Sequence, residues 1–235
     1  MEKLPIIIET LRNLNYLSEI LPFFFCLLFF KKINSKEIKV FFVYTTVSLL
    51  LFIISFYAYK FYPEHLNTIL SISLVVQFIF LSIIYFNIIR SAKIKKLIIF
   101  GTFAYIVFWI YNFLKSSFTD LDTTPFAIEC IFFMFLIVYY FYEIMRFNLD
   151  IQLYQLPSFW ISVAFLINFS GTFILFLFSK PLLNDPEFAN QNLVILSTIT
   201  IIKNILFCIA LTTTKKLINP KNHSTLPADL NLDSF

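Results

Sequence analysis

The residue with the clearest chemical significance is a lysine inside an apolar segment. Residues 192–216 read NLVILSTITIIKNILFCIALTTTKK, and Lys203 lies almost at their centre. In an α-helix with a rise of 1.5 Å per residue, Lys203 would lie about 16 to 18 Å from either end of this segment. An ammonium group in the middle of a bilayer costs about 3 kcal/mol on insertion scales, so it needs a partner or water. We therefore expect a partner for Lys203 at the same depth.

Glu19 is the first candidate for this partner. It precedes Lys31 by twelve residues, which is about 18 Å along a helix, so it lies near the middle of its own apolar segment. The first and last helices of a seven-helix bundle often lie next to each other when the bundle closes. We therefore predict an ion pair between Glu19 and Lys203, with Glu129, acting through water, as the second candidate.

Two further carboxylates lie near the ends of apolar segments. Glu129 stands one turn inside the end of its segment, where we expect water to reach it. Glu143 precedes Arg146 by three residues, a spacing that places the two side chains on one face of a helix. We expect Glu143 to pair with Arg146 or to point to the lipid headgroups.

Several uncharged polar side chains lie at comparable depth. Hydrogen bonds between membrane helices are worth about 0.6 to 2 kcal/mol each, and this structural role is the simpler interpretation of Gln77 and Asn168. The alternative is a polar or ligand-binding site inside the membrane, which would comprise Lys203, Glu19, Gln77, Asn168, Asn204 and Glu129.

Enzyme chemistry is not expected from this sequence. It contains no GxSxG or HExxH motif and no aspartate pair within an apolar segment, so no catalytic or metal-binding residue is predicted. Cys26, Cys130 and Cys208 lie inside apolar segments, which is typical of small buried residues rather than of a disulfide framework. A lysine in a seventh helix is also typical of retinal proteins, but Gln77 stands where their third helix has a carboxylate. We therefore predict no cofactor.

The elements that position these residues are predicted from hydropathy. Hydrophobic residues make up 59% of the 235 residues and charged residues only 14%, a balance typical of membrane proteins. Backbone polar groups in lipid must be paired within a segment, so helices of about 20 residues are expected. We predict an all-α bundle of seven membrane helices at residues 14–30, 40–59, 66–89, 97–114, 125–145, 158–179 and 192–213.

Basic residues in the loops predict the orientation of this bundle. Twelve of the 18 lysines and arginines fall on one side of the predicted helices and five on the other, with Lys203 between them. Because basic loops stay in the cytoplasm, we predict an external N-terminus and a cytoplasmic C-terminus in a multi-pass protein of the inner (plasma) membrane. The membrane domain would cover residues 1–216. Residues 217–235 are polar and contain two prolines, which predicts a flexible cytoplasmic tail.

The last three predicted helices resemble a known group of proteins. They read PFAIECIFFMFLIVYYFYEIMRF, LPSFWISVAFLINFSGTFILFLFS and IIKNILFCIAL, with Glu129, Pro157, Phe159, Trp160 and Gly171 as their most distinctive residues. These segments resemble uncharacterised seven-helix membrane proteins of Bacteroidota that are often encoded beside sensor histidine kinases. The resemblance implies an association with signalling, by genomic neighbourhood.

Two functions are consistent with this sequence. The first is a sensory or signal-coupling module without its own output domain, whose partners would be the lipid bilayer and a signalling protein such as a histidine kinase. The alternative is a small-solute transporter or a subunit of one, with Glu19, Gln77, Asn168 and Lys203 as its polar path. A net charge of +4 that is scattered along the chain gives no indication of nucleic-acid binding. A water-accessible cavity that reaches the polar layer would favour transport, whereas a sealed bundle would favour signalling.

Overall fold

A computed structural model describes residues 3–29, 35–115, 123–147, 153–182 and 186–217 of the chain. The described residues form seven α-helices and two short 3-10 helices, and they contain no strand. The long helices are α1 (Lys3–Phe29), α2 (Lys36–Phe61), α3 (Leu66–Ile88), α4 (Ala92–Lys115), α5 (Thr123–Phe147), α6 (Pro157–Leu182) and α7 (Pro186–Leu217). The 3-10 helices are η2 (Pro63–His65) and η3 (Leu153–Gln155). The all-α prediction is confirmed, and each predicted segment overlaps one helix, although α1 begins at Lys3 rather than at residue 14 and α7 at Pro186 rather than at residue 192. The predicted tail lies outside the described residues, apart from Leu217.

Six of the seven helices, α2 to α7, are long and apolar enough to cross a membrane. Of the seven predicted spans, six therefore have the length and composition that a membrane crossing requires. Helix α1 has the required length, but its first two thirds contain Glu9, Arg12, Asn13, Asn15 and Glu19, which lower its mean hydropathy. A complete crossing by α1, and with it the orientation of the chain, remain predictions.

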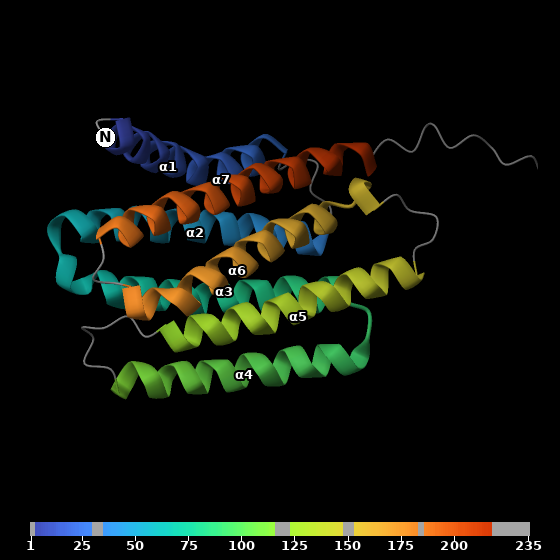
Figure 1. Cartoon of the computed structure of the whole chain (residues 1–235). Helices are drawn as coiled ribbons and strands as arrows, with labels where there is room; N and C mark the ends of the chain where they lie inside the picture. Colours follow the sequence, from blue (N-terminus) through green and yellow to red (C-terminus); the bar gives the residue numbers. More distant parts are fainter. Residues whose placement is uncertain (1–2, 30–34, 116–122, 148–152, 183–185, 218–235) are drawn as a thin grey trace, which may run out of the picture.

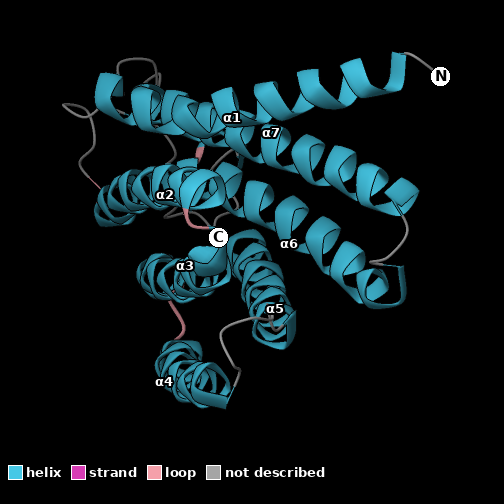
Figure 2. Ribbon diagram, turned by 90° about the vertical axis from the view of Figure 1, so that its left-hand side faces the viewer, coloured by secondary structure: helices cyan, strands magenta, loops and turns pink. Residues whose placement is uncertain are grey.

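The helices are packed in an order that places the first helix beside the last. Helix α7 packs between α1 and α6, α5 packs on α6, and α2 packs between α1 and α3. Helix α4 contacts α3 and α5 and lies at the edge of the bundle opposite α1, as Figures 1 and 2 show. The prediction that the first and last helices are neighbours is therefore confirmed.

Aromatic rings fill the space between these helices. Phe78 of α3 stacks on Tyr105 of α4 with ring centroids 3.7 Å apart, and its ring also contacts Phe133 of α5 at 4.9 Å. On the other side of the bundle, Phe207 of α7 contacts Phe41 of α2 at 4.9 Å. Edge-to-face pairs such as Phe78–Phe133 and Phe41–Phe207 stabilise packing beyond the area that they bury. Rings therefore hold the helices that position the polar residues.

The connection between α3 and α4 is held by a carboxylate from another helix. Helix α3 ends at Ile88, Ile89 has an extended backbone, and α4 begins at Ala92. The backbone N–H groups of Arg90 and Ser91 donate hydrogen bonds of 2.8 and 2.9 Å to the carboxylate of Glu143 in α5. Glu143 is buried, so the prediction that it points to headgroups is wrong. Its role is to satisfy amide groups at the start of α4, where helices have N–H groups without partners.

Close packing of α4 on α5 depends on a glycine. A Cβ atom at Gly101 would lie 2.7 Å from Cε2 of Phe132, whose ring is itself packed against Phe78. We expect Gly101→Val to destabilise the protein by about 1 to 3 kcal/mol, the usual cost of overpacking. Thermal unfolding in detergent measures this effect, with Ala104→Val at an exposed position of the same helix as the matched control. Equal stability of the two variants would show that α4 does not need this close approach.

Candidate functional site

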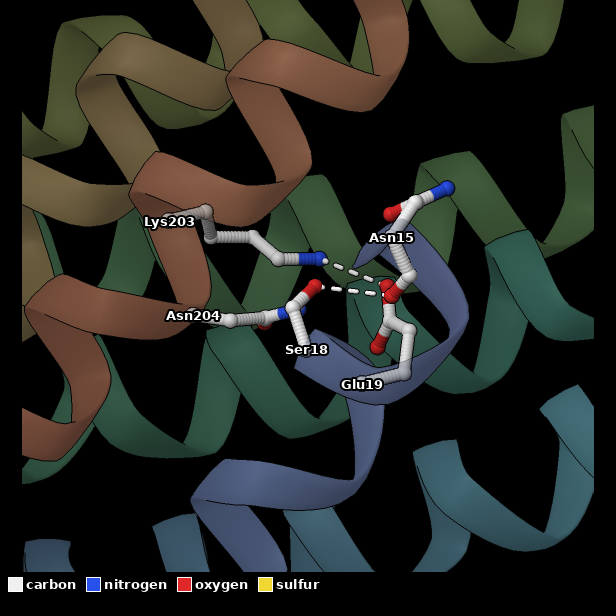
Figure 3. Close-up of polar contacts among 5 residues, drawn as sticks. All are labelled: Asn15, Ser18, Glu19, Lys203 and Asn204. Carbon is white, nitrogen blue, oxygen red and sulfur yellow. Dashed lines mark hydrogen bonds and ion pairs between the residues drawn. The ribbon is translucent and has the colours of Figure 1, made fainter. Parts of the chain in front are cut away.

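The centre of the site is an ion pair between α1 and α7. Nζ of Lys203 lies 3.6 Å from Oε1 of Glu19, and the two side chains are only 14% and 19% exposed. Figure 3 shows the lysine side chain reaching from α7 to the carboxylate on α1. Lys203 is the eighteenth residue of α7 and Glu19 the seventeenth of α1, so both lie near the middle of their helices. The ion pair expected from the sequence is present.

A hydrogen-bonded chain lies directly beside the ion pair. Nδ2 of Asn204 donates to Oγ of Ser18 at 3.0 Å, and the Ser18 hydroxyl donates to the backbone carbonyl of Asn15 at 2.8 Å (Figure 3). Asn204 and Ser18 are both buried. Asn204 thus lies beside the ion pair. Ser18 was missed, because its position beside Glu19 becomes significant only when α7 lies against α1.

A proline weakens the backbone of α1 at this level. Pro22 has no N–H group, so it cannot donate the helical hydrogen bond to the carbonyl of Ser18. Pro22 also lines a small space next to the ion pair, together with Tyr44 and Phe207. Helix α1 therefore lacks one backbone hydrogen bond, one turn from Glu19.

A cavity of about 230 Å³ opens from the ion pair between α1, α2, α3 and α7. Polar side chains line it together with apolar ones. The polar members are Glu19, Tyr44, Ser48, Ser55, Ser73, Gln77 and Lys203. Ser55 precedes the end of α2 by six residues, or about 9 Å along the helix, and Leu70 follows the start of α3 by four, or about 6 Å. The cavity thus extends from mid-depth toward the connection between α2 and α3.

The other predicted site residues lie in different places. Gln77 lines the cavity, whereas Asn168 and Glu129 are not among its lining residues within the described part of the chain. Asn168 is partly buried on α6, where its backbone carbonyl accepts a hydrogen bond from the Thr172 hydroxyl. The predicted polar path through Asn168 therefore does not form around this cavity.

Glu129 differs most from expectation. It is 0% exposed, so the prediction that water reaches it at the membrane rim is wrong. Neither carboxylate oxygen makes a hydrogen bond, although Gln77 and Tyr105 face them. The cause is tertiary: Phe126, Phe133 and the rings of α3 and α4 pack around the first turns of α5.

This arrangement presents a charged pair and a side-chain amide to the cavity. The ammonium of Lys203 and the carboxylate of Glu19 are complementary to a carboxylate and an amine, and Gln77 can both donate and accept hydrogen bonds. Among the described residues, no group of three or more His, Cys, Asp or Glu side chains is placed to hold a metal ion.

Comparison of the chain with family models, with curated proteins and with solved structures gives no match. The resemblance of its last three helices to Bacteroidota membrane proteins therefore stays a prediction.

Proposed function

We propose that this protein carries a small polar solute with one acidic and one basic group across a membrane. The observation that supports this function is the cavity that ends on Glu19 and Lys203 at mid-depth. A cavity that reaches the polar layer is what a carrier requires, and a sealed signalling bundle would lack it. The proposal therefore prefers transport, the alternative function from the sequence, to signalling.

The cavity restricts the size and charge of the solute. Its volume of about 230 Å³ lies below the roughly 300 to 1,000 Å³ of pockets for drug-sized ligands, so the solute has few heavy atoms. A carboxylate would bind Lys203 and an amine would bind Glu19. An amino acid or a similar zwitterion has both groups close together, as the 3.6 Å separation of the protein charges requires.

The ion pair also explains how the carrier avoids isolated charges inside the membrane when no solute is bound. Without solute, Glu19 and Lys203 neutralise each other, so neither is left as an isolated charge inside the membrane. A bound zwitterion would separate the two side chains and give each a new partner. The contact between Asn204 and Ser18 would then be the barrier on the far side of the site, and the reduced restraint at Pro22 would allow α1 to move.

Ligand-dependent thermal unfolding tests solute binding. We expect one or more proteinogenic amino acids to stabilise the purified protein by about 2.7 kcal/mol at one hundred times Kd. Amines and carboxylic acids with a single charged group should not. The variant with both Glu19→Gln and Lys203→Met removes the site as a pair and should lose the effect. The matched control makes the same types of change at exposed Glu64 and Lys60.

Transport is then measured as uptake of the stabilising amino acid into proteoliposomes. The wild type and the control variant should accumulate it, and the variant without the charged pair should not. Absence of both stabilisation and uptake for all these solutes would contradict the proposed function.

Signal coupling remains the second candidate, because the ion pair lies beside the α1–α7 contact. A solute that separated Glu19 from Lys203 would act directly on the neighbouring hydrogen bond between Ser18 and Asn204. The resulting shift of α1 against α7 would be the signal, read by a membrane or cytoplasmic protein such as a histidine kinase. Solute binding without any uptake into proteoliposomes would favour this function over transport.

A further inference from the structure

Glu129 is a buried carboxyl group that the solute site does not use. It is fully buried in the first half of α5, and both of its oxygens lack a hydrogen bond. The hydroxyl of Tyr105 on α4 is also buried and without a partner. Buried polar groups in proteins almost always have partners, so three orphan oxygens in one place require an explanation.

The groups around Glu129 include several hydrogen-bonding side chains. Gln77 of α3 and Tyr105 of α4 face its carboxyl group. Tyr44 of α2 and the neighbouring Cys130 lie close enough for electrostatic interaction with it, and Thr172 of α6 faces Cys130. None of these groups carries a positive charge. An ionised carboxylate would therefore be buried in this setting without a compensating charge, which is strongly unfavourable.

A neutral carboxylic acid avoids this cost, and its proton would have a route to water. Gln77 faces Glu129 and also lines the cavity that contains Glu19 and Lys203. Its amide oxygen can accept a hydrogen bond from the protonated acid, and its NH₂ group can donate to the carboxylate. The Tyr105 hydroxyl can donate to the carboxylate as well. Small rotations of these side chains would therefore provide partners for either form.

We propose that Glu129 is a proton-binding site in the membrane interior that exchanges its proton with water in the Glu19–Lys203 cavity past Gln77. On release, the O–H bond of the carboxyl group breaks, a water molecule of the cavity accepts the proton, and the carboxylate stays on Glu129. The reverse reaction restores the acid. If the protein is a carrier as proposed above, this site supplies a proton that can move with the solute, and that coupling rests on the proposed function.

Infrared difference spectroscopy on the protein in lipid at neutral pH tests the proton site without any solute. The spectrum of the wild type minus that of Glu129→Gln should contain the C=O stretching band of a protonated carboxyl group. The band should shift in D₂O, because the proposed site exchanges with cavity water. The matched control, wild type minus Glu19→Gln, should contain carboxylate bands instead, because Glu19 is paired with Lys203. Only carboxylate bands in the Glu129→Gln difference would overturn the proposal.

Two further results keep the test decisive. Glutamine has nearly the shape of a protonated glutamate, so Glu129→Gln should fold; failure to fold would count against a neutral acid. The variant Gln77→Leu should keep the carboxyl band but slow its shift in D₂O, and an unchanged rate would exclude the route past Gln77. Because no solute is added, failure of the proton site is distinct from failure of the carrier.

Discussion

Replacing Lys203 by methionine is expected to destabilise the protein by about 3 kcal/mol, because the carboxylate of Glu19 loses its partner inside the bundle. Breaking a buried ion pair costs about 3 to 5 kcal/mol, and the 14% and 19% exposure of these side chains places the effect at the lower end. Glu19→Gln should have a similar effect, since it leaves the ammonium unpaired. The double variant should be more stable than the sum of the two losses predicts, because both charges are removed together.

Thermal unfolding of the four proteins in one detergent provides this double-mutant cycle. Lys96→Met, at an exposed position of α4, is the matched control for the loss of a lysine and should have little effect. If the losses of the single variants simply add, Glu19 and Lys203 do not interact. If neither single variant changes the stability of the protein, water in the cavity hydrates both groups fully.

Replacing Glu143 by alanine should destabilise the protein by at least about 2 kcal/mol, because two backbone N–H groups lose their acceptor at once. The carboxylate lies where α4 begins, and a negative charge also interacts favourably with a helix N-terminus. Glu143→Gln keeps one acceptor oxygen and should lose less. The Glu143 side chain links α5 to the start of α4. The loss of stability should therefore be largest at the edge of the bundle that α4 forms.

Thermal unfolding and amide hydrogen exchange together measure this effect. In Glu143→Ala, the amides of Arg90 and Ser91 should exchange faster than in the wild type. Glu64→Ala is the control, because Glu64 is an exposed carboxylate in another helix connection. If the two alanine variants are equally stable, the bonds from Glu143 do not hold the start of α4.

The sequence predicted the helices well, because these follow from the length and composition of each apolar segment, and the same segments provided an estimate of the depth of each polar residue. The same depth estimate predicted the ion pair, since Glu19 and Lys203 are both central in their helices and α1 lies next to α7. The depth estimate did not show that Gln77 and Asn168 have different surroundings. These residues are at similar depth, but only Gln77 lines the cavity, which depends on how α3 and α6 are rotated about their axes.

The errors in the sequence analysis concern carboxylates whose surroundings come from distant helices. Glu143 was expected to pair with Arg146 or to point to the headgroups, and its bonds to backbone amides 52 and 53 residues away in sequence were not foreseen. Glu129 was assigned to the membrane rim because it is near the start of α5, but rings from α3 and α4 bury it. Local spacing contains no information on either set of neighbours.

The contact between α1 and α7 has a consequence for the order of events during biosynthesis. Ser18 and Asn204 are 186 residues apart, and a ribosome that adds about 5 to 20 residues per second needs roughly 10 to 40 s to synthesise that length. During this time Glu19 is in a nascent chain without Lys203, in the helix that falls short of the apolar content of the other six. We therefore expect α1 to remain at the translocon or the lipid interface until α7 is inserted, so the last helix made would fix the first one in the bilayer.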